Sequence, residues 1–106
     1  MGEINKAEPV LRAAIRQLPN NPSTYNSLAQ VFLRQEKPEK ARDMLLLAVT
    51  GNPDFATGHA NLAMLYAMIN QRNQAKLHLG KALQLGLRNS VTENLHKILQ
   101  SPLKKR

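Results

Sequence analysis

The chain has 106 residues, 42% of them hydrophobic and 21% charged, which is enough for one small globular domain. No apolar run reaches the roughly 18 residues of a membrane span, and the absence of cysteine excludes disulfides, thiol catalysis and thiolate metal sites. Lysine and arginine exceed the acidic residues by 15 to 7, and the net charge of +8 indicates an anionic partner or a strongly solvated surface.

The compartment is not fixed by these numbers. The first ten residues, MGEINKAEPV, lack the hydrophobic segment of a signal peptide. A cytoplasmic location is therefore favoured, and a periplasmic one stays open if a signal or anchor was removed.

The first expected element is an amphipathic helix that ends near residue 18. Pro9 would clash inside a helix that began at Ile4, because proline lacks the N–H and its ring meets the preceding turn. We therefore expect this helix to start near Ala7 or Glu8, with Pro9 in its first turn.

The next element is a helix that begins after Asn21. Asn21 is suited to cap the helix, and Pro22 suits its first position. Its apolar residues follow the i, i+3, i+4, i+7 spacing of one helical face: Tyr25, Leu28, Ala29 and Phe32.

Three more helices follow the same alternation of apolar stripes and stops. We expect them over about 38–51, 55–69 and 72–85, with Gly51 or Asn52 in the left-handed conformation that ends many helices. A last amphipathic helix over 90–100 carries polar residues on its outer side, as a solvated capping helix requires.

An internal repeat of 34 residues underlies this alternation. The recurring positions are Ala7, Ala41 and Ala75; Leu11, Leu45 and Leu79; Ala14, Ala48 and Ala82; Pro19 and Pro53; Leu28 and Leu62; Ala29 and Ala63; Phe32 and Tyr66. Small residues at these points let paired helices approach closely, and large ones would wedge them apart.

These residues resemble the tetratricopeptide repeats, a family of 34-residue helix–turn–helix units. The matches are Tyr25, Leu28, Ala29, Phe32, Ala41, Leu45, Ala48 and Pro53 in residues 22–55; Leu62, Ala63, Tyr66, Ala75, Leu79 and Ala82 in 56–89; and Ala7, Leu11, Ala14 and Pro19 in 7–19. The second repeat departs at His59, where a large aromatic is usual, and at Leu87, where proline is usual.

The resemblance implies an all-α, right-handed superhelical α-solenoid of antiparallel helix pairs with about five helices. We expect a single domain over 1–106. Its parts are the second half of a truncated repeat (1–21), full repeats (22–55 and 56–89), a capping helix (90–100) and a basic tail (101–106).

The sequence carries no enzyme signature, so we expect no catalytic residues, no cofactor and no metal. His59, His78 and His96 lie 18 or 19 residues apart, and none forms the i, i+4 pair of a helical metal site. Asp54 and His59 could form a catalytic dyad on paper, but no suitably placed nucleophile accompanies them.

In the resembled family, the first helix of each repeat lines a concave groove that binds peptides or helices of partner proteins. Removing the core positions from the first helices leaves these groove candidates: Asn26, Gln30, Arg34, Asn61, Met64 and Met68. The amides can donate to and accept from a peptide backbone, and the methionines offer an adaptable apolar patch. We therefore expect a non-catalytic protein-interaction scaffold.

One branch of the family grips the C-terminal carboxylate of chaperones with lysine and asparagine side chains. Asn61 falls on one such position, whereas Asn26 stands where lysine is expected and Gln30 where asparagine is expected. The missing cation disfavours that specificity.

Two alternatives remain open. The first helix has no partner of its own, which predicts either a longer parent protein or a homo-oligomer formed through Ile4, Val10, Leu11, Ile15 and Leu18. Alternatively, a basic convex face docks a polyanion. Nucleic acid is disfavoured, because no aromatics accompany the basic clusters.

Overall fold

The computed structural model describes the backbone of residues 2–100 and the side chains of residues 6–100. It contains six helices: α1 (Gly2–Gln17), α2 (Pro22–Arg34), α3 (Pro38–Gly51), α4 (Ala56–Met68), α5 (Arg72–Gln84) and α6 (Ser90–Gln100). The count is six rather than about five, because the half-repeat, the two full repeats and the capping helix contribute one, four and one. None of these helices is both long and apolar enough to cross a membrane.

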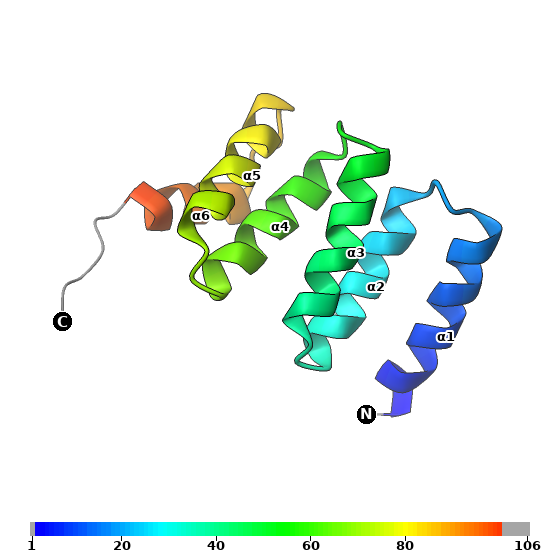
Figure 1. Ribbon diagram of the computed structural model, residues 1–106. Helices are drawn as coiled ribbons and strands as arrows, with labels where there is room; N and C mark the ends of the chain where they lie inside the picture. The colour runs from blue at the N-terminus through cyan, green and yellow to red at the C-terminus, as the bar shows by residue number, and fades with distance from the viewer. Residues whose placement is uncertain (1, 101–106) are drawn as a thin grey trace.

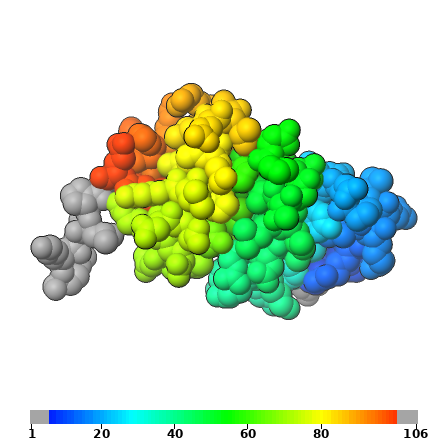
Figure 2. Space-filling view, turned by 45° about the horizontal axis from the view of Figure 1, so that its top comes forward, coloured from blue at the N-terminus to red at the C-terminus, as the bar shows by residue number. Residues whose placement is uncertain are grey.

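The helices form a row in chain order, with α1 and α6 at its opposite ends (Figure 1). The closest packing is within the pairs α2–α3 and α4–α5, and α3 joins the two pairs by packing on α4. The result is an elongated molecule of 44 × 31 × 20 Å, as Figure 2 also shows. Each pair buries its apolar face against its neighbours, as a solenoid requires.

The core consists of the residues that recur in the sequence. Those with no exposed surface are Leu28, Ala29, Ala41, Leu45, Ala48, Leu62, Ala63, Ala75 and Ala82, together with Leu65. The alanines lie where helices touch, so a larger side chain at these positions would force the helices apart. The expectation that the recurring small residues mark helix contacts is confirmed by this burial.

The start of α1 differs from the expectation. The helix begins at Gly2 and continues through Pro9, rather than starting near Ala7 or Glu8. The cost is local: Pro9 offers no N–H to the carbonyl of Asn5, and the helical turns on either side supply the remaining backbone bonds.

The helix ends were predicted less well than the helix starts. Asn21 caps α2 as expected, since its Oδ1 accepts a 3.1 Å hydrogen bond from the Ser23 N–H. In contrast, Gly51 is the last residue of α3 and Asn52 has a φ of −138°, so neither is left-handed. The side chain of Asn52 instead donates to the carbonyl of Asn20, which ties two successive turns together.

The left-handed residues follow α2, α4 and α5 instead. They are Glu36 (φ 59°), Asn70 (φ 63°) and Gly86 (φ 90°). After each of them, the next N–H turns back to a carbonyl five residues earlier: Lys37 to Phe32, Gln71 to Tyr66 and Leu87 to Ala82. This 6→1 bond is the Schellman closure, which needs a left-handed residue just before the donor.

Candidate functional site

The proposed groove residues Asn26 and Asn61 touch each other. The Asn61 side chain in α4 donates a 2.7 Å hydrogen bond from Nδ2 to Oδ1 of Asn26 in α2. The two helices are first helices of successive repeats, and both side chains are half-buried. The bond therefore brings the outward positions of α2 and α4 onto one face.

The bonded amides keep hydrogen-bonding capacity. The bond uses one N–H of Asn61 and one lone pair of Asn26. An amide side chain has two N–H donors and two acceptor lone pairs, so Asn26 retains its NH₂ group and Asn61 retains its carbonyl oxygen. The pair can therefore still pair with both the carbonyl and the N–H of an extended backbone.

The other candidates divide by exposure. Met64 is half-buried and packs against the core, while Met68 is 65% exposed at the end of α4. Gln30 is half-buried in α2, and Arg34 is exposed in its last turn. Only part of the predicted set is therefore available to a partner without movement of the core.

A hollow of about 360 Å³ lies beside the methionines. Its lining includes Ala67, which shares a helical face with Met64 and Met68, and Ile98 of α6, which is largely exposed. We call Met64, Ala67, Met68 and Ile98 the methionine patch. Sequence reasoning missed Ala67 and Ile98, because the packing of α6 on α4 is not visible in the spacing of residues.

Arg72 holds α6 in place beside this patch. Its Nη2 donates hydrogen bonds to the carbonyls of Leu99, at 2.7 Å, and of Ile98, at 3.4 Å. These carbonyls lie in the last turn of α6, where a helix has unpaired acceptors and a partial negative charge. The position of Ile98 in the patch therefore depends on Arg72.

The first helices provide almost no charge to this face. Neither α2 nor α4 contains an acidic residue, and Arg34 is the one charged side chain in these two helices. The surface is therefore polar through amides and apolar through methionine, rather than strongly charged.

Solved structures with the same arrangement of helices are found at low sequence identity. The first TPR domain of Spaghetti (RPAP3), bound to the HSP90 peptide SRMEEVD, has a TM-score of 0.84 and 23% identity over 93% of this chain and 79% of that chain. The Arabidopsis OM64 TPR domain has a TM-score of 0.85 and 19% identity, with coverage of 93% and 82%. The Sgt2 TPR domain from Aspergillus fumigatus has 0.85 and 18%, with coverage of 93% and 67%.

The chain has the tetratricopeptide-repeat fold. The fold class expected from the sequence, an all-α right-handed superhelical solenoid of helix pairs, is thereby confirmed. No profile of a known protein family matches the chain, and no curated protein matches it.

The N-terminal edge of this tetratricopeptide solenoid is partly apolar. Val10 is 67% and Leu18 61% exposed, as expected for an open edge. Leu11 and Ile15, by contrast, are half-buried and pack against the core, because they face α2. The side chain of Ile4 and the basic tail 101–106 lie outside the described residues.

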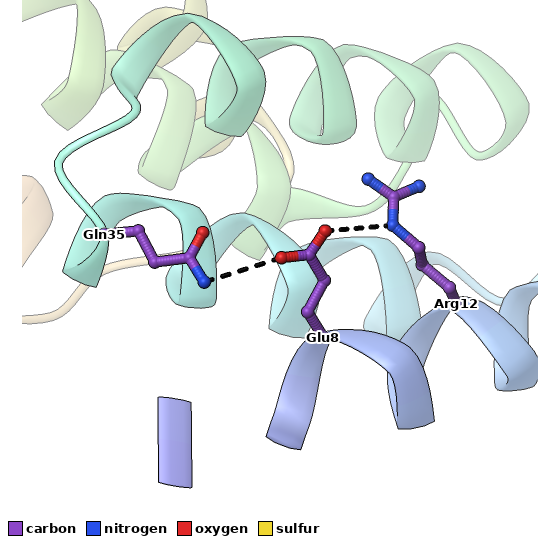
Figure 3. A network of polar contacts seen from close by, with 3 residues as sticks. All are labelled: Glu8, Arg12 and Gln35. Atoms are coloured by element: carbon purple, nitrogen blue, oxygen red, sulfur yellow. Dashed lines mark hydrogen bonds and ion pairs between the residues drawn. The ribbon is translucent and has the colours of Figure 1, made fainter. Parts of the chain in front are cut away.

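A polar contact fixes α1 against the end of α2 (Figure 3). Glu8 accepts a 3.1 Å hydrogen bond from Nε of Arg12 and a 3.5 Å one from Nε2 of Gln35. The bond from Arg12 leads the causes that lower the pKa of Glu8 below its usual value. The expected neutralisation of Glu8 by Arg12 is confirmed, whereas Arg42 pairs with Asp43 rather than with Glu39.

Two of the three histidines form a buried pair that the sequence did not predict. Nδ1 of His59 in α4 lies 3.1 Å from Nδ1 of His78 in α5. Nε2 of His59 bonds to the Pro53 carbonyl, so its ring is not engaged by Asp54 as the hypothetical dyad requires. Residues 2–100 contain no group of three or more His, Cys, Asp or Glu that could hold a metal ion.

A signal for this pair was present in the repeat. Both histidines interrupt it within one hairpin, since His59 stands where the preceding repeat has Tyr25, and His78 where it has Met44. Two like departures in one antiparallel hairpin are a reason to test whether they meet.

Proposed function

We propose that this chain is a non-catalytic protein-interaction scaffold that binds a peptide or helix of a partner on the face formed by α2 and α4. The binding residues are Asn26, Gln30, Arg34 and Asn61 together with the methionine patch. Backbone hydrogen bonds to the two asparagines would orient the partner, and apolar side chains would fill the patch.

The observation that carries this proposal is the bond between Asn61 and Asn26. It links first helices of successive repeats across 35 residues of sequence and leaves a donor on one amide and an acceptor on the other. A polar pair next to an exposed Met68 is the combination that an amphipathic ligand needs: directional bonds beside an adaptable apolar surface.

The chemistry of the face favours an uncharged or apolar partner segment. The peptide held by the TPR domain of Spaghetti, SRMEEVD, ends in three acidic residues within four positions. In this chain α2 and α4 offer Arg34 alone as a cation, and Asn26 occupies a position where carboxylate-binding relatives of this fold are expected to have lysine. Electrostatic attraction to such a tail would be weak and screened by salt.

A peptide selection tests the proposal. Peptides that bind the intact chain are selected from a displayed random library, and their Kd is measured by fluorescence anisotropy. We expect selected peptides to be rich in apolar residues, to bind in 0.5 M salt (a concentration chosen to screen surface charges), and to bind more tightly than SRMEEVD. Met68→Glu should weaken binding by more than about tenfold, because it places a charge in the centre of the patch.

The matched control is Leu77→Glu. Leu77 is 52% exposed, close to the 65% of Met68, but belongs to α5, a second helix. The variant should leave the Kd within about twofold, as expected for a residue away from the interface. Loss of binding in Leu77→Glu with no loss in Met68→Glu, or a library that yields no binder, would overturn the proposal.

Self-association through α1 is a second candidate, supported by the exposure of Val10 and Leu18. Two large apolar side chains in one helix can be covered by a second copy of that helix. Sedimentation velocity over a hundredfold concentration range tests it: the expected result is a dimer that Val10→Glu with Leu18→Glu converts to monomer. A concentration-independent monomer mass for the unmodified chain would exclude it.

A further inference from the structure

The imidazoles of His59 and His78 form a closed polar contact inside the second hairpin. Both rings are buried, and their Nδ1 atoms lie 3.1 Å apart. The other nitrogen of His59, Nε2, lies 2.9 Å from the carbonyl oxygen of Pro53. Two of the four ring nitrogens are thus committed to each other and a third to the backbone.

The contacts assign the proton positions of the neutral pair. The Pro53 carbonyl can only accept, so Nε2 of His59 carries its hydrogen. Nδ1 of neutral His59 is then an acceptor, and Nδ1 of His78 must be the donor. This assignment, made from the hydrogen-bond network, leaves Nε2 of His78 without a proton.

The pair also belongs to a stack of rings that joins α4 to α5. The His78 ring lies 5.3 Å from that of His59 and 5.7 Å from that of Tyr66, at interplanar angles of 21° and 14°. His59 and Tyr66 are both on α4, so His78 of α5 is held between them. In the preceding repeat the equivalent positions hold Tyr25 and Met44, neither of which has an imidazole.

The pair can take up one proton but not two. A first proton can sit on Nε2 of His78 without disturbing the shared bond. A second would convert Nδ1 of His59 to a donor, so that two N–H groups on two positive rings would face each other at 3.1 Å. In the unfolded chain both rings are in water and each can be protonated on its own.

The surroundings of His78 oppose even the first proton. Burial, followed by the charges of His59 and Lys81, lowers the pKa of His78 below its usual value. Tyr66 of α4 stacks on the ring, and α3 approaches the start of α4 through the apolar Val49 at Gly58, its charged residues Glu39, Lys40, Arg42 and Asp43 lying in its first half. From α6, Glu93, His96 and Lys97 face the hollow beside Leu83 and Arg88. No carboxylate is among the groups that act on His78.

We propose that His59 and His78 make the hairpin α4–α5 pH-sensitive, holding it closed at neutral pH and loosening it below about pH 6.5, the ordinary pKa of histidine. The unfolded chain binds more protons than the folded pair in this range, so stability falls as pH falls. The stabilisation is present above the unfolded pKa and is lost as pH drops from about 6.5 towards the lowered folded pKa of His78. Loosening α4 would also weaken binding by Asn61 and the methionine patch. That consequence rests on the proposed function, whereas the change in stability does not.

The repeat provides the variant that tests this. His59→Tyr with His78→Met copies the residues of the first hairpin into the second. Thermal unfolding is followed by circular dichroism at pH 7.5 and 5.5, above the range where carboxylates titrate, with a chelator in all buffers. The intact chain should lose about 4–8 °C more in Tm than the double variant, the shift that a roughly fivefold fall in the folded-to-unfolded ratio gives a domain of this size.

Two further variants complete the experiment. His96→Gln removes the exposed third histidine and should lose as much Tm as the intact chain. His78→Gln keeps an N–H for His59 and replaces the double variant if that one does not fold; it too should lose less Tm than the intact chain. Equal losses in the intact chain and in the variants of the pair would overturn the proposal.

A ring-proton NMR titration of the intact chain is an independent measurement. The Cε1–H signal of His78 should move at a lower pH than that of His96. A His78 signal that titrates together with that of the exposed His96 would also overturn the proposal.

Discussion

Asn61 of α4 donates a 2.7 Å hydrogen bond to Asn26 of α2, and this bond joins first helices that otherwise belong to separate hairpins. Within residues 2–100, the hairpins are joined mainly by the packing of α3 on α4. A side-chain bond on the opposite side of the solenoid fixes the angle between α2 and α4, and with it the shape of the proposed groove.

A double-mutant cycle measures this bond. Asn26→Ala and Asn61→Ala should each lower the free energy of unfolding by about 0.5–1.5 kcal/mol, because each leaves a half-buried amide without its partner. The double variant should lose less than the sum, with a coupling of at least about 0.5 kcal/mol. Urea unfolding gives the values, and Asn73→Ala, at an exposed position in α5, is the control with an effect within about 0.5 kcal/mol. Strict additivity would show that the bond does not form in solution.

Glycine at position 58 is required by packing rather than by backbone conformation. A Cβ there would lie 2.6 Å from Cδ2 of Phe55 and 2.8 Å from Cγ1 of Val49, closer than carbon atoms can approach. Gly58→Ala should therefore lower stability by about 1–3 kcal/mol, although alanine is the better helix former. Gly80→Ala in α5 meets nothing within 4 Å and should raise stability by about 0.4–1 kcal/mol. Equal effects of the two variants in thermal unfolding would contradict this account.

The sequence predicted the features that depend on periodicity. Ala29, Leu62 and Ala63 recur or pair at the repeat spacing, and their complete burial follows from the need to bring two helices together. The groove face was likewise obtained by removing such positions. The proximity of Asn26 and Asn61 was not predicted, because it depends on the crossing of two helices rather than on spacing along one.

Features that depend on local backbone closure or on cross-helix contact were missed. Glu36 is left-handed although glutamate has no preference for that conformation, since the Schellman bond from Lys37 to Phe32 requires it. The helix through Pro9 was missed because the rule for proline describes a cost and not a prohibition. The His59–His78 pair was missed because a separation of 19 residues has no meaning until the hairpin is folded.

The cap of α2 provides a test of the helix start. Asn21→Ala removes the acceptor for the Ser23 N–H and should lower the free energy of unfolding by about 1 kcal/mol. Asn21→Ser keeps an oxygen acceptor at the same place and should lose clearly less than Asn21→Ala. Both are measured as shifts of the urea midpoint at constant slope. An alanine variant as stable as the serine variant would mean that the cap contributes nothing to this helix.

The left-handed residues give the last prediction, because the same turn is closed by different residues. Glu36→Gly should raise stability by up to about 1 kcal/mol, since a left-handed conformation costs an ordinary residue roughly 1–2 kcal/mol and the gain is partly offset by the greater freedom of glycine in the unfolded chain.

Asn70→Gly, at the equivalent turn of the next repeat, should gain less than Glu36→Gly, because asparagine tolerates this conformation better than glutamate. Gly86→Ala should lose about 0.5–1 kcal/mol, although a Cβ at that position meets nothing within 4 Å, so the loss isolates the backbone conformation from packing. The three variants are compared by urea unfolding with the intact chain. A Gly86→Ala variant that gains stability as Gly80→Ala is expected to do would show that the turn after α5 is not left-handed in solution.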